Sequence, residues 1–404
     1  MPRDVTSSHA HKIDLMLALT IFALVIFGLI MISSASVVVS YENFGVNNYY
    51  LKRQLVSLLI GMSIWILIQN INYQFWKRFA RTIFYISLLL LVLVFIPGIG
   101  FGHGGANRWI HVGPIFVQPT ELLKLTLILF LATWFEEKRF EVRDFKRVFL
   151  PFLGILAFIG LLVLKQPDMG TLSIISIIAF SVFFVAGANF RHLLAAFGCG
   201  IMLFGFLIKI APYRLARLTI FLDPAKDSQG IGYHITQAMI AIGSGGLFGL
   251  GFGHSRQKYN YLPEASTDSI FAIVAEELGF FRSMIVILLF AYLAWRGYKV
   301  AKHAPDYFGK LVATGITTWF AFQAFINIAA MLSLVPLTGI PLPFISYGGS
   351  NLVFSLAAAG LLLNISKYTQ GEGHYESDSY WWRNWWAYFA NTIRRKATRR
   401  KARG

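Results

Sequence analysis

The chain has 404 residues, of which 56% are hydrophobic and only 14% are charged, and its mean hydropathy is +0.60. This composition excludes an ordinary water-soluble protein. The apolar residues fall in runs of about 17 to 25, the length that crosses a hydrocarbon core about 30 Å thick. The single cysteine, Cys199, lies inside such a run, which excludes a disulfide framework and a zinc-finger spacing. We therefore expect an all-α polytopic integral membrane protein.

Ten segments are expected to cross the membrane as helices. In chain order they cover residues 15–35, 54–71, 82–97, 119–135, 149–165, 171–187, 193–211, 270–296, 308–332 and 349–366. Most connections between them are short, but residues 212–269 form a long connection between the seventh and eighth spans. Connections of that length are usually functional. The predicted organisation is an N-terminal segment 1–14, a membrane domain 15–366 and a tail 367–404.

The formal net charge of +17 would suit a nucleic-acid-binding protein, but the basic residues sort by membrane side. If both termini are cytoplasmic, 24 of the 36 lysines and arginines fall in cytoplasmic segments, as the positive-inside rule requires. The charge is therefore interpreted as an orientation signal, and no nucleic-acid partner is expected. The tail carries WWRNWW followed by a basic cluster, which suits a helix in the headgroup layer or a disordered basic end.

Two outside loops have unusual compositions. Residues 98–118 are rich in glycine and aromatic residues, and the loop 212–269 mixes apolar residues with repeated glycines. Irregular backbone at membrane depth survives only where protein or a wet cavity satisfies its polar groups, so an outward-facing cavity is expected. The glycines do not form a phosphate-binding loop, because no strand precedes them and no GK[ST] follows.

The strongest local signal is LPEASTDSIFAIVAEELG, residues 262–279, at the outside entrance of the eighth span. If this segment is helical, Glu264 and Asp268 lie on one face. Asp268 also suits a helix N-terminus, and capping is the structural alternative to a catalytic role. Glu276 and Glu277 follow about two turns deeper, where ionisable residues are functional or paired, with Arg282 as the expected partner.

Other acids and cations are expected at the same membrane leaflet. Glu121 and Lys124 lie in QPTELLK, and Lys165 and Asp168 lie in KQPDMGT. Each pair taken singly is explained by a helix start with a snorkelling lysine. Taken together with the basic residues of the neighbouring loops, Arg108, Arg214 and Arg217, they favour an anionic lipid-linked substrate. The outside histidines lack a metal-binding spacing, and no GxSxG element supports covalent hydrolysis.

Several motifs in register resemble those of the shape, elongation, division and sporulation family, which includes FtsW and RodA. They are GANRWI (105–110), QPTELLK, QPDMGT, RLTIFLDP (217–224), AIGSGGLFGLGFGHSRQKYNYLPEASTD (241–268), EELGF and VPLTGIPLPFISYGGS (335–350). The match covers about residues 10–366 and is closer to the FtsW and sporulation branch. Ser269 departs from the family, which usually has Phe after the TD pair. Phe281 and Arg282, which replace a small pair after EELG, and Ser333, which replaces a Gly, are further departures, and the tail is not a family feature.

The resemblance implies a peptidoglycan glycosyltransferase that polymerises lipid II at the outer face of the bacterial cytoplasmic membrane. It also implies a class B penicillin-binding protein as partner, with other division or elongation membrane proteins. Asp268 corresponds to the catalytic acid of the family, and an inverting transfer needs one base. Candidates for binding the substrate and its diphosphate are Lys124, Arg108, Trp109, Arg214, Arg217, Glu264 and Glu121. Pro341, Pro343, Ser346, Tyr347, Gly348 and Gly349 are interpreted as cavity wall.

Three questions stay open at this stage. A divalent cation (Mg²⁺ or Mn²⁺) bridging the diphosphate and a carboxylate such as Glu264 is an alternative to cationic side chains alone. A flippase of the lipid-linked precursor also fits ten spans and an outward cavity, although it should carry charged intramembrane residues near the inner leaflet as well. A non-catalytic scaffold that docks division partners has no need of Asp268.

Overall fold

A computed structural model describes residues 13–369, except 104–105, 113–114, 211, 225–226 and 228–229. The helices are α1 (Leu15–Ala35), α2 (Val37–Phe44), α3 (Tyr49–Asn70), α4 (Tyr73–Leu93), α5 (Pro119–Glu137), a π-helical turn (Phe145–Phe149), α6 (Leu150–Lys165), α7 (Met169–Val185), α8 (Phe190–Ile210), α9 (Pro212–Leu222), α10 (Ile231–Gly245), α11 (Ile270–Lys302), α12 (Tyr307–Met331) and α13 (Gly349–Ser366). The strands are β1 (Gly100–His103), β2 (Ala106–Val112) and β3 (Ile115–Val117). The predicted tail lies outside the described residues from Gln370 onward.

Each of the ten predicted spans coincides with one long helix, so the predicted helical membrane architecture is confirmed. Six helices of the described part are long and apolar enough to cross a membrane by length and composition alone, with α7 as a shorter apolar helix. The third span begins earlier than predicted. Helix α4 starts at Tyr73, where the Asn72 side chain caps it, whereas hydropathy rises only after the basic residues that end at Arg81.

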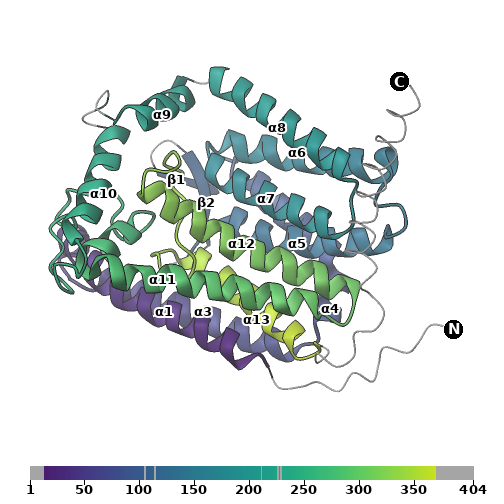
Figure 1. The fold of residues 1–404 in the computed structure, drawn as a ribbon, viewed down its shortest axis with the longest axis horizontal. Coiled ribbons are helices and arrows are strands. Elements are labelled where there is room, and N and C mark those ends of the chain that lie inside the picture. Colours follow the sequence, from purple (N-terminus) through teal and green to yellow (C-terminus); the bar gives the residue numbers. More distant parts are fainter. Residues whose placement is uncertain are drawn as a thin grey trace, which may run out of the picture. The chain divides into compact units, whose positions relative to one another are not determined.

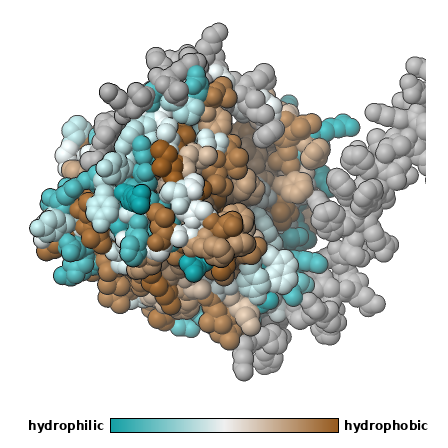
Figure 2. All heavy atoms as spheres, turned by 60° about the vertical axis from the view of Figure 1, so that its left-hand side comes forward, coloured by the Kyte–Doolittle hydropathy of each residue, from teal (hydrophilic) through white to brown (hydrophobic). Residues whose placement is uncertain are grey.

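The long helices of the described part lie side by side (Figure 1). Helix α3 packs against α13, α4 against α5, and α11 against both α1 and α12. Helices α12 and α13 are the most enclosed, because 78% of the apolar window of each is buried. Figure 2 shows a broad hydrophobic band between two regions where hydrophilic side chains gather. Exposed apolar side chains such as Leu59, Leu161 and Phe325 suit contact with lipid.

The loop between α4 and α5 forms a small antiparallel sheet, which the sequence analysis did not predict. Strand β2 pairs with both β1 and β3, and the register shifts between Phe101 and Gly102. Three short strands are hard to recognise within a segment rich in glycine. The sheet gives this loop a fixed shape and brings Arg108 to the turn between α6 and α7.

The long connection 212–269 contains two helices followed by an irregular segment. Helices α9 and α10 form an arc beside the ends of the long helices, at the left of Figure 1. Residues 246–251 then pair with α11 through backbone hydrogen bonds, including Leu250 N to Glu276 O at 3.0 Å and Phe280 N to Gly246 O at 2.9 Å. These bonds form where α11 is broken, at Gly279 with φ 76° and ψ −178°. The break separates the short segment after Asp268 from the long remainder of α11.

Candidate functional site

Asp268 lies in a turn immediately before α11. Helix α11 begins at Ile270 with Ser269 as its N-cap, and no side chain makes a capping hydrogen bond there. The segment from Leu262 to Ser269 is a series of turns, and Glu264 has φ 52°. The expected helical face shared by Glu264 and Asp268 is therefore wrong, and Asp268 is not a helix cap. Its side chain is free for another role.

The environment of the Asp268 carboxyl favours its neutral form. Burial, with the nearby charge of Glu264, raises the pKa of Asp268 to about 7, and Arg217 opposes this shift. Thr267 connects the two acids, since its hydroxyl donates to Glu264 Oε2 at 2.6 Å and lies 3.3 Å from Asp268 Oδ1. A carboxyl group that titrates near neutral pH is suited to general base catalysis.

Two neighbouring segments hold the turn that carries Asp268. The Asn327 amide on α12 donates to Asp268 O at 2.7 Å and to Ile340 O at 2.8 Å. Tyr347 N donates to Ser266 O at 2.9 Å, which joins the turn to the loop before α13. Each bond fixes backbone rather than the carboxyl group, so the position of the turn is set without these neighbours engaging the carboxyl oxygens.

The predicted cavity-wall residues lie in the loop 332–348 and the first turn of α13. Pro343 and Ser346 are buried, and the Ser346 hydroxyl accepts from Leu342 N at 2.7 Å. The carbonyl of Pro341 accepts from Gln323 on α12 at 2.9 Å. Gly339, in the same loop, lies near Asp268: a Cβ there would be 3.7 Å from Asp268 Oδ2. The remaining members, Tyr347, Gly348 and Gly349, are half-buried.

Ser269, the departure from the family pattern, makes its own contacts. Its hydroxyl lies 2.6 Å from His234 Nε2 and donates to Pro263 O at 2.9 Å. Burial lowers the pKa of His234, which favours the neutral ring. The hydroxyl therefore ties α10 to the turn before α11, a link that a phenylalanine could not make.

Lys124 and Glu121 are buried together rather than open to a cavity. Lys124 Nζ lies 2.8 Å from Glu121 Oε1 and donates to Gln323 Oε1 at 2.8 Å, and it lies over the Trp319 ring at 4.6 Å from the centroid. Asn351 on α13 donates to the second Glu121 oxygen at 3.0 Å. The pair thus joins α5, α12 and α13. Through Gln323 it also holds Pro341, in the loop that borders Asp268.

Of the three predicted arginines, Arg217 acts on Asp268, Arg108 binds a turn distant in the sequence, and Arg214 has a side chain outside the described residues. Arg217 on α9 contributes to the electrostatics of Asp268, and its Nη1 lies 3.4 Å from Leu337 O. Arg108 donates to Gln166 O at 3.1 Å and Pro167 O at 2.7 Å, which fastens the sheet to the turn before α7. Its neighbour Trp109 is half-buried on β2. Arg214 precedes Arg217 by one turn of α9, and its side chain lies outside the described residues.

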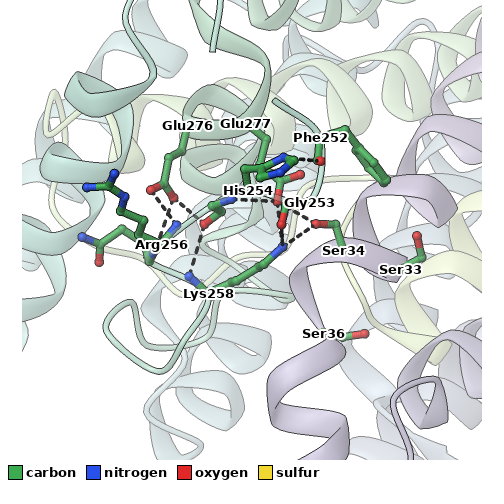
Figure 3. Close-up of polar contacts among 12 residues, drawn as sticks. Ser33, Ser34, Ser36, Phe252, Gly253, His254, Arg256, Lys258, Glu276 and Glu277 are labelled. Atoms are coloured by element: carbon green, nitrogen blue, oxygen red, sulfur yellow. Dashed lines mark hydrogen bonds and ion pairs between the residues drawn. The ribbon is translucent and has the colours of Figure 1, made fainter. Parts of the chain in front are cut away.

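Glu276 and Glu277 are buried in a polar network (Figure 3), and their partners differ from the predicted Arg282. Lys258 Nζ lies 3.2 Å from Glu277 Oε1 and donates to Gly253 O at 2.6 Å. Ser34 on α1 donates to the same Glu277 oxygen at 2.6 Å. The Ser255 hydroxyl donates to Glu276, as do the backbone amides of the two residues that follow it. The expected partner, Arg282, instead donates to Phe248 O at 3.1 Å.

This network fastens the segment 253–258 to both α1 and α11, ten residues before Asp268. The sequence did not predict these two partners of Glu277. Within HSRQKYN, Lys258 has the surroundings of a solvated lysine, and Ser34 is one of several serines at the end of an apolar run. Within the described part of the chain, no group of three or more His, Cys, Asp and Glu side chains could hold a metal ion.

Comparison with known proteins agrees with the motifs. The FtsW/RodA/SpoVE family of cell cycle proteins matches residues 14–371. Stage V sporulation protein E of Bacillus subtilis is 43% identical over 88% of this chain and 98% of the relative. The probable peptidoglycan glycosyltransferase FtsW of Trichlorobacter lovleyi is 41% identical over 87% of this chain and 93% of the relative.

Solved structures agree as well. One comes from a peptidoglycan synthase complex that coordinates polymerization and crosslinking; it is similar with a TM-score of 0.74 and 29% identity, over 88% of this chain and 97% of that one. The rod shape determining protein RodA of Thermus thermophilus is similar with a TM-score of 0.64 and 29% identity, over 89% of this chain and 98% of that one. The chain is therefore a multi-pass membrane protein that belongs to the FtsW/RodA/SpoVE family of cell cycle proteins.

Proposed function

We propose that this chain is a peptidoglycan glycosyltransferase that polymerises lipid II into β-1,4 glycan strands, with Asp268 as the general base. The observation that carries the proposal is the position of the Asp268 carboxyl: it caps no helix, and Thr267 links it to Glu264 in the turn before α11, where burial raises the pKa of Asp268 to about 7. The relatives named peptidoglycan glycosyltransferase FtsW support the same activity.

The reaction needs one base and stabilisation of one leaving group. The acceptor's 4-hydroxyl oxygen forms a bond to the donor anomeric carbon, while the bond from that carbon to the diphosphate oxygen breaks and the configuration inverts. Asp268 takes the hydroxyl proton, which contributes about 10² to 10⁴-fold. The departing diphosphate is already a good leaving group and needs positive charge more than a proton.

Arg217 is the cation best placed to stabilise the diphosphate, because its charge acts on the Asp268 carboxyl. Arg214 and Arg108 remain candidates on the neighbouring elements, and Trp109 remains a candidate platform for a sugar or the lipid. Lys124 and Glu121 support the site indirectly. Lys124 of this ion pair donates to Gln323, and Gln323 in turn donates to Pro341 O in the loop 332–348. If a divalent cation takes part, Glu264, exposed and close to Asp268, is the carboxylate that would hold it, and the cation would supply positive charge to the leaving group.

The same proposal gives the protein its place and its partner. Asp268 faces the outside of the bacterial cytoplasmic membrane, with both termini in the cytoplasm, as the basic residues favour. A class B penicillin-binding protein crosslinks the strands, in line with the similar synthase complex. A role in division, with other division membrane proteins, is favoured by the FtsW and sporulation relatives.

The test is polymerisation of purified lipid II by the full chain in detergent, alone and with the matching penicillin-binding protein. Wild type is expected to form glycan strands, and Asp268→Asn at least 100-fold fewer. The variant should fold. A carboxyl whose pKa is raised on folding lowers the stability of the folded protein as pH rises from the ordinary pKa of the group through the raised one. The amide of asparagine does not ionise, so it removes this loss.

Equal activity of wild type and a folded Asp268→Asn would place the base elsewhere, and Glu264→Gln would then be tested. Absence of strands from wild type with its partner, where a lipid II flipping assay gives transport, would replace the glycosyltransferase with the transporter.

A further inference from the structure

The end of the molecule opposite Asp268 contains a pocket of about 370 Å³, within the usual size of small-molecule sites. It lies between α4 and α5 and is lined by Gln74, Lys77, Arg78, Arg81, Thr133 and Glu137. Helix α11 shows where this end lies: it begins at Ile270, just after Asp268, and near its far end Arg296 pairs with Asp14, which precedes α1. Gln74 joins this same end by donating to Asp306 before α12.

The lining of the pocket carries an excess of positive charge. Lys77 and Arg81 pair with the two acids at the end of α5, Lys77 with Glu136 at 2.7 Å and Arg81 with Glu137. Arg78 is exposed and makes no ion pair with any residue that the structure describes. Two of the three cations are thus paired with acids, and within the described part of the chain Arg78 supplies the unpaired positive charge that suits a phosphate group.

The surroundings point to a phosphate that carries acyl chains. Phe75, Arg78 and Phe79 share one face of α4, at spacings of three and four residues. Phe75 and Phe79 are 48% and 39% exposed, and their ring centroids are 5.0 Å apart. This apolar face lies in the first two turns of a helix that spans about 31 Å, so it is at headgroup depth. Acyl chains can pack against the exposed rings of Phe75 and Phe79, whereas a free inorganic phosphate would make no favourable contact with them.

We propose that this pocket binds the phosphate headgroup of an anionic phospholipid, with Arg78 and Arg81 on the phosphate and the acyl chains along Phe75 and Phe79. Basic pockets between membrane helices on the cytoplasmic side bind such headgroups. The bound lipid would connect α4 to α5 beside their two ion pairs. This site is separate from the glycosyl-transfer site, and its test does not depend on that activity.

The experiment is native mass spectrometry of the full chain in detergent, titrated with cardiolipin, with phosphatidylcholine or with inorganic phosphate. Wild type is expected to retain cardiolipin in preference to phosphatidylcholine. Arg78→Gln with Arg81→Gln should bind cardiolipin about 30-fold more weakly, which is about 2 kcal/mol for two basic residues. Arg78→Lys with Arg81→Lys should keep most of the affinity, because charge rather than fork geometry attracts the headgroup.

The matched control removes two exposed cations at the same end of the molecule, Lys146→Gln with Arg191→Gln. This control should bind cardiolipin as wild type does, and thermal unfolding establishes that every variant folds. The proposal is overturned by equal weakening in both double variants, by unchanged binding in Arg78→Gln with Arg81→Gln, or by inorganic phosphate that competes as strongly as the lipid.

Discussion

Asp268 can accept a proton only while it is ionised, and its surroundings oppose ionisation. Since burial and Glu264 raise its pKa to about 7, polymerisation should fall about tenfold for each pH unit below that value. Glu264→Gln removes a negative neighbour and should move this acid limb to lower pH. The measurement is kcat/KM for lipid II from pH 5 to 9, with Glu42→Gln, an exposed acid on α2, as control. If Glu264→Gln does not shift the acid limb of the pH profile, that limb reports the titration of a group other than Asp268.

Lys258 and Glu277 form an ion pair whose side chains are only 5% and 0% exposed. Removing one partner leaves the other charge buried, so Lys258→Met should destabilise the protein by about 3 to 5 kcal/mol. Lys258→Met with Glu277→Gln should recover most of that loss, because no charge is then unpaired. Arg256→Met, a change at an exposed neighbour, is the control. Thermal unfolding in detergent measures all four proteins, and a double variant no more stable than Lys258→Met would contradict the ion-pair account.

The sequence predicted individual residues with uneven success, for a physical reason. Asp268 was singled out because an acid in the TD pair at a span entrance is chemically conspicuous and matches a family motif, and its catalytic role stays a prediction. The partners of Glu276 and Glu277 were not, because Arg282 is close along the chain whereas Lys258 and Ser34 come from other segments. Burial of Lys124 was equally hidden, since a lysine one turn into a helix also suits snorkelling. Pairing across segments is a property of the fold, not of local spacing.

Close contact between α10 and α11 positions the start of α11, and this contact requires glycine at one place. A Cβ on Gly245 would lie 2.0 Å from the Ala275 carbonyl oxygen, whereas a Cβ on Gly243 meets no atom within 4 Å. Gly245→Ala should therefore destabilise the protein by about 1 to 3 kcal/mol and reduce polymerisation by shifting Asp268. Gly243→Ala, two residues away on the same helix, should leave both unchanged or raise stability slightly. Equal effects of the two substitutions, measured by unfolding and strand synthesis, would exclude this packing role.

Helices that hydropathy alone defines were predicted well. Features that depend on backbone hydrogen bonds between segments were not predicted. All ten long helices followed from apolar runs, because the bilayer leaves no alternative for a spanning segment of that length. The break at Gly279 and the strands before α5 arise from backbone pairing with other parts of the chain. An apolar run read on its own contains no signal for either.

Orientation of the whole molecule decides whether Asp268 meets lipid II on the outside of the membrane. The polar end with Asp268 also carries exposed Tyr259, and the opposite end carries Phe140, which is fully exposed between α5 and α6. In a Cys199→Ser background, a membrane-impermeant thiol reagent should label Tyr259→Cys in intact cells. Phe140→Cys should be labelled only after the membrane is permeabilised.

This outcome follows from charge, because the segments around Phe140 hold Lys138, Arg139 and Arg143, and basic residues are retained in the cytoplasm. Labelling of Phe140→Cys but not Tyr259→Cys in intact cells would invert the topology. It would place Asp268 in the cytoplasm, where no external glycan strand could be extended, and would move the anionic-lipid pocket to the outer leaflet. A single pair of substitutions thus tests a condition that the proposed chemistry shares with the proposed lipid site.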